Sequence, residues 1–198
     1  MALDHLSTDA FAAGDGSAPN PDAARDYLRS DRISPVLLEL LTERAKPDTS
    51  PYRPRTMDGT QFAALRALVD EVIPQDGPQD GSERIDLAAR LDTMMAESNG
   101  NGWRYEALPT DPDAYRLGLD TLNAAACATG AEGFAALSSS DRVALLGRAE
   151  RAELDAGAAG APFDAAQMKL WFEELRSDAV RLYVAHPATL ARMGYGGT

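Results

Sequence analysis

Cysteine, histidine and aromatic residues are scarce in this sequence, and each shortage excludes a class of protein. The single cysteine, Cys127, excludes an internal disulfide. The two histidines, His5 and His186, are too few to hold a metal without many carboxylates. Aromatic residues make up 7% of the chain and alanine is abundant, which suits packed helices better than sheet. No CxxCH motif is present, so a covalently attached c-type haem is excluded.

Long apolar runs and clusters of basic residues are also missing. No run of about 18 apolar residues occurs, so we predict no transmembrane helix. The formal net charge of −12 argues against nucleic acid and anionic membranes as partners, because both attract clustered Lys and Arg. The N-terminal residues MALDHLSTDAF are acidic and contain neither twin arginines nor an apolar h-region. We therefore expect no signal peptide and a cytoplasmic location.

Motifs that carry enzyme chemistry are absent as well. The sequence contains no GxSxG, no HExxH, no P-loop and no GxGxxG after a strand. The acidic turn at residues 75–81 contains Asp76 and Asp80, with Glu83 nearby, but lacks the DxDxDG spacing of a calcium loop. Cys127 lies in an alanine-rich segment, which predicts a buried small hydrophobe in a helix rather than a nucleophile. We predict no catalytic, metal or cofactor site in this chain.

The longest regular pattern runs from Phe163 to Tyr183, FDAAQMKLWFEELRSDAVRLY. The residues with the spacing of one helix face are Met168, Trp171, Phe172, Leu175, Ala179, Leu182 and Tyr183. Leu170, Val180 and Val184 lie on the opposite side of the same helix. A helix that is apolar on two sides needs cover on both sides. It is therefore either the central helix of a bundle, which we favour, or a helix that keeps one side for another chain.

Helix signals divide the chain into a tail, an arm and a body. Residues 1–20 are small and polar with interspersed Gly and Pro, which predicts a disordered tail. Residues 21–57 are interpreted as a helical arm followed by a Pro-rich extended connector. Residues 58–198 are interpreted as a helical domain. No segment has the pattern of a strand, so we predict an all-α bundle of about five main helices with an N-terminal helical arm.

Capping signals mark several of the predicted helix starts. Asp58 with Gln61 has the spacing of a capping box. Asp111 is predicted to be an N-cap followed by a proline at the first helical position. Pro74 is expected to end the helix that Asp58 opens, because proline cannot continue it.

The body carries motifs in a fixed order. The first is F-x-x-L-x-x-L-x-D-x-V-I-P, from Phe62 to Pro74, followed by the acidic Gly turn. The later ones are Tyr115-x-x-Gly118-Leu119-x-x-Leu122; Gly133-Phe134-x-x-Leu137-Ser138 with Leu145 and Leu146; Phe163 and Phe172-x-x-Leu175; Tyr183-x-x-His186-Pro187; and Gly194-Tyr195-Gly196-Gly197. This ordered set, over residues 58–197, resembles the small, non-catalytic subunit of gluconate 2-dehydrogenase, called gamma or subunit 3.

The resemblance implies a helical subunit without catalytic residues that binds a large flavoprotein of the glucose–methanol–choline oxidoreductase type. FAD and the catalytic residues are then expected in the large subunit, which oxidises sugars, sugar acids or related polyols. Electrons often leave such complexes through a separate cytochrome subunit. The small subunit is expected to support the folding, stability or export of its partner. The alternative is a free-standing helical adaptor or chaperone with a different protein partner.

The N-terminal part differs from the pattern of that family. Many members begin with a twin-arginine signal, whereas residues 1–57 of this chain form an acidic tail and an arm. This difference favours a cytoplasmic complex, and a periplasmic one exported with a partner is the alternative. The arm either packs on its own bundle or embraces the large subunit.

The candidate partner-binding residues lie on the second side of the long helix and in the segment after it. They are Leu170, Val180, Val184, His186, Met193 and Tyr195. Glycines around Tyr195 permit a backbone that follows another surface closely, and a tyrosine anchor can carry binding energy. Tyr183, His186 and Tyr195 form a polar aromatic cluster, interpreted as a hydrogen-bonded helix end. We expect the end of the helix and residues 193–197 to dock on the large subunit.

Overall fold

The computed structural model describes residues 21–31, 33–46, 48, 51–75, 84–98, 105–154 and 161–195. The predicted tail, the calcium-like residues Asp76, Asp80 and Glu83, and the last two glycines lie outside the described residues.

Every regular element in the described residues is helical, which confirms the all-α prediction. The elements are α1 (Pro21–Leu28), α2 (Pro35–Arg44), α3 (Gly59–Val72), α4 (Leu87–Ala96), α5 (Asp111–Cys127), the 3-10 helix η1 (Phe134–Ala136), α6 (Ser139–Glu150), α7 (Ala165–Val184) and α8 (Pro187–Arg192). Five of them, α3 to α7, are the predicted main helices, and α1 and α2 are the predicted arm. The short helix α8 was not predicted.

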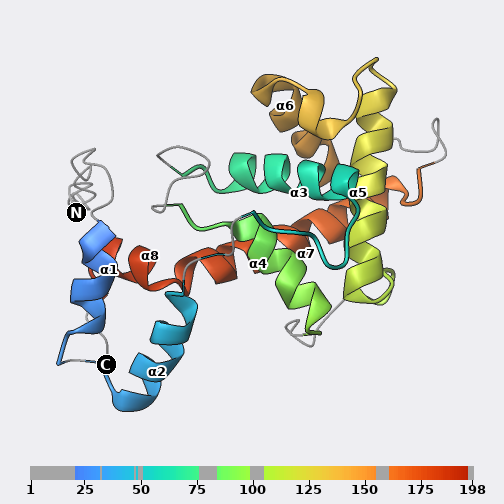
Figure 1. Ribbon diagram of the computed structural model, residues 1–198. Coiled ribbons are helices and arrows are strands. Elements are labelled where there is room, and N and C mark those ends of the chain that lie inside the picture. Colours follow the sequence, from blue (N-terminus) through green and yellow to red (C-terminus); the bar gives the residue numbers. More distant parts are fainter. Residues whose placement is uncertain are drawn as a thin grey trace, which may run out of the picture.

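The hydrophobic core lies between α3, α4, α5, α6 and α7 (Figure 1). The predicted stripe of α7 is buried from Met168 to Ala179, and Met168, Trp171, Leu175 and Ala179 have no exposed surface. At its C-terminal end, Leu182 and Tyr183 are half-buried and pack against the core. Helix α7 packs against each of the other four main helices, with α5 crossing its N-terminal half (Figure 1). The central-helix interpretation is thus confirmed for this side of α7.

Capping boxes begin two of the main helices. At α3, Gln61 N donates to Asp58 Oδ1 at 2.8 Å, and Asp58 N donates to Gln61 Oε1 at 3.0 Å, as predicted. Asp164 and Gln167 form the same reciprocal pair at the start of α7. The predicted N-cap of α5 is wrong by one residue. Thr110 occupies the cap position there, and Asp111 is the first helical residue.

Cys127 lies in the last turn of α5 and is exposed, so the prediction of a buried cysteine is wrong. The buried stripe of α5 includes Leu119, Leu122 and Ala126. One further residue along a helix turns the side chain by about 100°. This rotation takes Cys127 off the stripe, which the alanine-rich composition of the segment did not reveal.

Helices α5 and α7 meet where Gly118 faces Trp171. A Cβ atom at Gly118 would lie 2.1 Å from Cε2 of Trp171, so a side chain here would collide with the indole ring. The Nε1 atom of Trp171 is buried and has no hydrogen-bond partner among the described residues. Trp171 therefore contributes by apolar packing, and the missing side chain of Gly118 makes the close packing possible.

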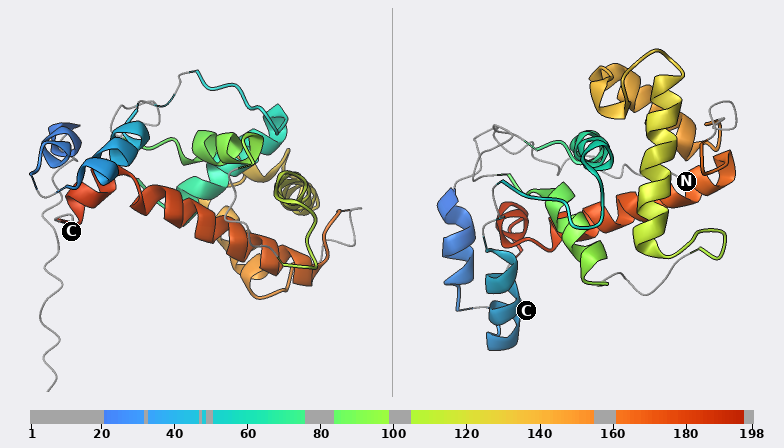
Figure 2. Two further views of the ribbon diagram at one scale, coloured as in Figure 1. Left: turned by 90° about the horizontal axis from the view of Figure 1, so that it is seen from below. Right: turned by 45° about the vertical axis from the view of Figure 1, so that its right-hand side comes forward.

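The arm packs against the C-terminal end of the chain. Helices α1, α2 and α8 lie together on one side of the molecule in all views (Figures 1 and 2). In the single chain, the arm therefore packs on α8.

Replacing Gly118 with alanine should lower the free energy of unfolding by about 1–3 kcal/mol or more, because a rigid indole ring has to move. Gly59→Ala is the matched control, since a Cβ atom there meets nothing within 4 Å. Chemical denaturation measures both variants. Equal stability of Gly118→Ala and the control would show that α5 and α7 do not meet in this way.

Candidate partner-binding surface

The second side of α7 is not covered by its own chain near the C-terminal end of the helix. Val180 and Val184 are 44% and 38% exposed, although both are apolar. They lie one helical turn apart and are neighbours on one face. Leu170, at the other end, is half-buried and packs against the core. The expectation that the bundle covers this whole side is therefore wrong at the two valines.

His186 caps the short helix α8 instead of facing outward. Its Nδ1 atom accepts a hydrogen bond from the backbone N–H of Ala188 at 3.2 Å. Burial, together with the positive charges of Arg90 and Arg192, lowers the pKa of the imidazole to about 4. The ring is therefore neutral near neutral pH, as an acceptor must be. For His186, the interpretation as part of a hydrogen-bonded helix end is confirmed.

Met193 and Tyr195 follow α8 and are exposed, at 55% and 44%. Gly194 between them has a φ of +67°, the left-handed conformation that favours glycine. Tyr195 N donates to Leu190 O at 3.0 Å, and Gly194 N donates to Ala191 O at 3.1 Å. These two bonds form a Schellman motif, so Gly194 ends α8 and directs Tyr195 outward.

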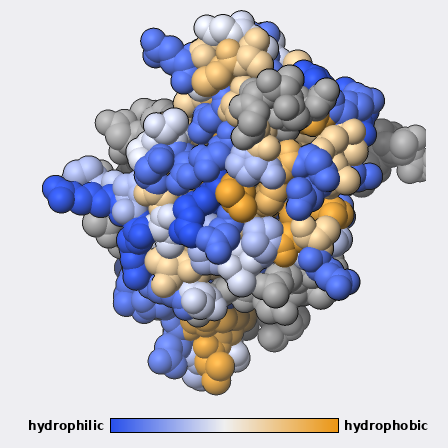
Figure 3. Space-filling view, turned by 90° about the vertical axis from the view of Figure 1, so that its right-hand side faces the viewer, coloured by the Kyte–Doolittle hydropathy of each residue, from blue (hydrophilic) through white to orange (hydrophobic). Residues whose placement is uncertain are grey.

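Other exposed apolar residues lie on separate elements. Val36 and Leu40 are exposed on α2, and Val143 is exposed on α6. On the face seen in Figure 3, hydrophilic residues are mixed with separate apolar patches. Exposed apolar surface in the described residues is therefore divided among several places, of which the Val180–Val184 pair belongs to the main helix.

A buried carboxylate fixes the connector that precedes the body. Asp92 of α4 has no exposed surface. Its Oδ2 atom accepts from Arg55 N at 2.6 Å and from Tyr52 Oη at 2.7 Å, and its Oδ1 atom accepts from Thr56 N at 3.0 Å and from Thr56 Oγ1 at 2.5 Å. Burial alone would raise the pKa of the Asp92 carboxyl, but these hydrogen bonds outweigh burial and lower it.

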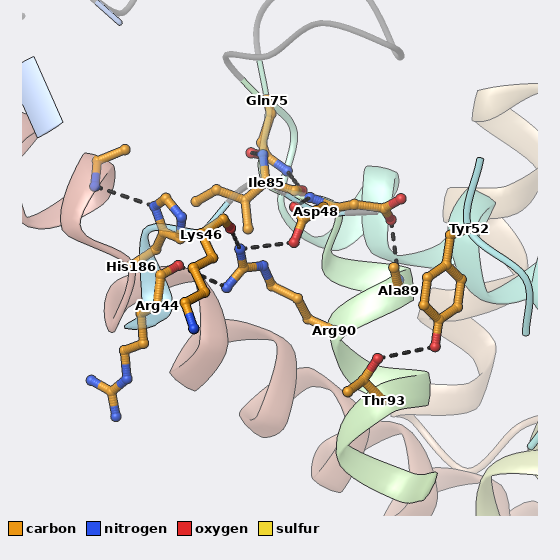
Figure 4. A network of polar contacts seen from close by, with 12 residues as sticks. Arg44, Lys46, Asp48, Tyr52, Gln75, Ile85, Ala89, Arg90, Thr93 and His186 are labelled. Atoms are coloured by element: carbon orange, nitrogen blue, oxygen red, sulfur yellow. Dashed lines mark hydrogen bonds and ion pairs between the residues drawn. The ribbon is translucent and has the colours of Figure 1, made fainter. Parts of the chain in front are cut away.

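Arg90, two residues before Asp92 on α4, holds the end of α2 and the segment that follows it (Figure 4). Its guanidinium donates to Arg44 O at 3.1 Å and to Lys46 O at 3.2 Å, and it pairs with Asp48 at 2.8 Å. Asp48 in turn accepts from Asp86 N at 2.8 Å. The sequence predicted an extended connector but not these polar attachments to α4.

Two acidic residues of α7 are also buried, although the apolar pattern of the helix did not indicate this. Asp178, which is 3% exposed, accepts from Tyr115 Oη at 2.9 Å and pairs with Arg181 at 2.9 Å. Burial and the charge of Asp178 raise the pKa of Tyr115 well above its ordinary value, so the phenol stays a donor. Glu174 is buried one turn earlier. Paired in this way, Asp178 links α5 to α7.

Metal ligands and ligand-sized hollows were expected to mark any site for chemistry. Among the described residues, no three His, Cys, Asp or Glu side chains gather in a group that could hold a metal ion. An open depression of 240 Å³ lies between the start of α3, Asn123 and the segment around η1. It is smaller and more open than the pockets that enclose small ligands. In the part of the chain that the structure describes, no helix is long and apolar enough to cross a membrane.

Asp92→Asn should lower the free energy of unfolding by about 1.5–3 kcal/mol at neutral pH, because charge-assisted hydrogen bonds are lost. The lowered pKa means that this contribution is present above the unfolded-state pKa of about 4 and is lost as the pH falls through the lower folded-state value. The stability difference should therefore shrink in acid. Asp26→Asn, on an exposed residue of α1, is the control. A pH-independent difference would contradict the assignment.

Comparisons with known proteins identify the family. No curated protein and no solved structure matches the chain. The family model described as gluconate 2-dehydrogenase subunit 3 matches residues 59–196, which include α3 to α8, both valines and the segment up to Tyr195. Because the match spans more than half of the sequence, the chain belongs to the gluconate 2-dehydrogenase subunit 3 family and is, by that membership, a subunit type of a dehydrogenase complex.

Proposed function

We propose that this chain is the non-catalytic accessory subunit of a dehydrogenase whose catalytic subunit is a large FAD-containing flavoprotein of the glucose–methanol–choline type. The partner would oxidise a sugar, a sugar acid or a related polyol, and would pass electrons on, in some complexes to a cytochrome. The family membership supports a place in a dehydrogenase complex. The exposed valine pair, Val180 and Val184 on α7, is the observation that indicates where the partner would bind.

The valine pair has the properties of a docking site on a rigid element. The opposite face of α7 is held by Trp171 and by the other fully buried residues of its stripe, so the exposed face cannot turn inward. Burying two valines against a partner is favourable in proportion to the apolar area removed from water. Met193 and Tyr195 extend the exposed apolar surface beyond α8. A flavoprotein that covers them would gain contacts with a preformed helix face.

The role that fits such a surface is support of the partner's folding and stability. A ligand that binds only the native state of a protein stabilises that state by mass action. By binding the folded flavoprotein, this chain would raise the stability of the flavoprotein without taking part in the reaction.

We expect the complex in the cytoplasm, and export together with a partner is the alternative.

Affinity capture from the source cells tests the proposed function. The tagged full-length chain should copurify with a large protein that shows flavin absorbance and oxidises sugars or polyols with an artificial electron acceptor. The chain purified alone should be colourless and inactive. Copurification of a partner without flavin would favour the adaptor or chaperone function instead, and flavin bound by the isolated chain would contradict the accessory role.

Val180→Asp should weaken capture of the flavoprotein by more than about tenfold, or about 1.4 kcal/mol, because a charge is placed in an apolar contact. Val143→Asp is the matched control, since Val143 is also an exposed valine, on α6, with 53% exposure against 44% for Val180. Both variants should keep the circular dichroism of the native chain. A titration in which both bind as well as the unaltered chain would place the docking surface elsewhere.

A further inference from the structure

Helix α8 packs mainly on a segment outside the family region. The family match covers residues 59–196, so α8 belongs to it and the arm helices α1 and α2 do not. In the structure, the main neighbour of α8 is α1, and α2 and the end of α7 make smaller contacts (Figure 2). The part of the chain that matches the family therefore includes a surface of α8 against which another helix packs. In this chain, that helix is α1 of the arm.

The arm and α8 bury apolar residues that are separate from the main core. Ile33 and Leu41 of the arm and Pro187 of α8 are buried, but none of them belongs to the core cluster of α3 to α7. The arm and α8, which contact one another, therefore bury apolar residues outside the main core. Opening their contact would leave the main core intact.

Helices α1 and α8 each contain a buried hydroxyl group that makes no hydrogen bond within the part of the chain that the structure describes. The hydroxyl groups of Tyr27 on α1 and Thr189 on α8 are both buried and have no hydrogen-bond partner among the described residues. Burying a hydroxyl without a partner costs free energy. Helix α1 has only 8 residues, too few for a helix that is stable alone. Low-stability segments with such contacts open locally before the rest of a protein unfolds.

The base of the arm is held much more firmly. Arg90 binds the carbonyl oxygens of Arg44 and Lys46 and pairs with Asp48 (Figure 4), and Asp92 binds residues 52–56 through several hydrogen bonds. Charge-assisted hydrogen bonds of this kind are the strong ones. The arm is therefore fixed at its base and weakly attached at its tip, so that α1 can leave α8 while the connector stays on α4.

We propose that α1 is a displaceable cover of a docking surface on α8, and that the catalytic flavoprotein takes the place of α1 when the complex forms. This proposal rests on the proposed function for the identity of the partner. The uncovered face of α8 would follow Val184 directly along the chain and lead to the exposed Met193 and Tyr195. Uncovering α8 would thus add accessible surface in the segment between these two exposed apolar sites.

A cover of this kind lowers the apparent affinity for the partner. Binding is reduced by the fraction of molecules in which the surface is open. Changes that loosen α1 should therefore tighten binding, and changes that strengthen its contact should weaken binding. If α1 were instead part of the interface with the partner, loosening α1 should weaken binding and strengthening its contact with α8 should tighten binding.

Two substitutions at Tyr27 in the full-length chain test this relation. Tyr27→Ala removes the half-buried ring of Tyr27 from α1 and should tighten capture of the flavoprotein about threefold or more. Tyr27→Phe removes only the unpaired hydroxyl and should strengthen the cover and weaken capture. Glu39→Ala, on an exposed residue of α2, is the control and should change nothing. Weaker capture by Tyr27→Ala, or a change in the same direction for both Tyr27 variants, overturns the proposal.

Amide hydrogen exchange of the free chain and of the copurified complex supplies a second readout. In the complex, the amides of α1 should exchange faster than in the free chain, whereas those of α8 should exchange more slowly. Capture of a flavoprotein with unchanged or increased protection of α1 overturns the displacement and leaves the proposed function standing. Failure to capture any flavoprotein overturns the proposed function, and the displacement by a flavoprotein with it.

Discussion

The close contact between Trp171 of α7 and Gly118 of α5 is the constraint on which the arrangement of the body depends. The indole ring is fully buried and lies where any side chain at position 118 would be. This contact fixes the orientation of α7 about its own axis, because the ring fits at only one place against α5. The same orientation leaves Val180 and Val184 on the outside. The exposed surface of α7 is thus a consequence of how its buried side packs.

Apolar packing and polar bonding hold different parts of the molecule. The main helices are joined by a continuous core, with Asp178 as a buried polar link between α7 and Tyr115. The connector, in contrast, is fixed to α4 by Asp92 and Arg90. The tip of the arm lies outside the main core, and the buried hydroxyl of Tyr27 on α1 has no hydrogen-bond partner among the described residues. The body is thus rigid, the connector is firmly attached and the tip of the arm is weakly attached. This difference would allow α1 to be displaced while the rest of the chain keeps its structure.

The sequence was sufficient to predict the features that depend on residues close to one another. The periodicity of α7 predicted its buried stripe, and the spacing of Asp58 and Gln61 predicted a capping box. It could not predict the attachment of the connector to Asp92, because those hydrogen bonds join residues about 36–40 positions apart and leave no local pattern. Helix α8 was missed because six residues are too few for a periodic signal. The exposure of the two valines also depended on tertiary packing, since the pattern alone allowed cover by the bundle.

A structure of the full-length chain bound to its catalytic flavoprotein would show directly which face of the small subunit the partner covers. We expect Val180 and Val184 to be buried in the interface, α7 to keep its packing against α5, and the flavoprotein to contact α8 where α1 lies in the free chain. A complex in which both valines remain exposed to solvent, with the partner on another face, would contradict this expectation.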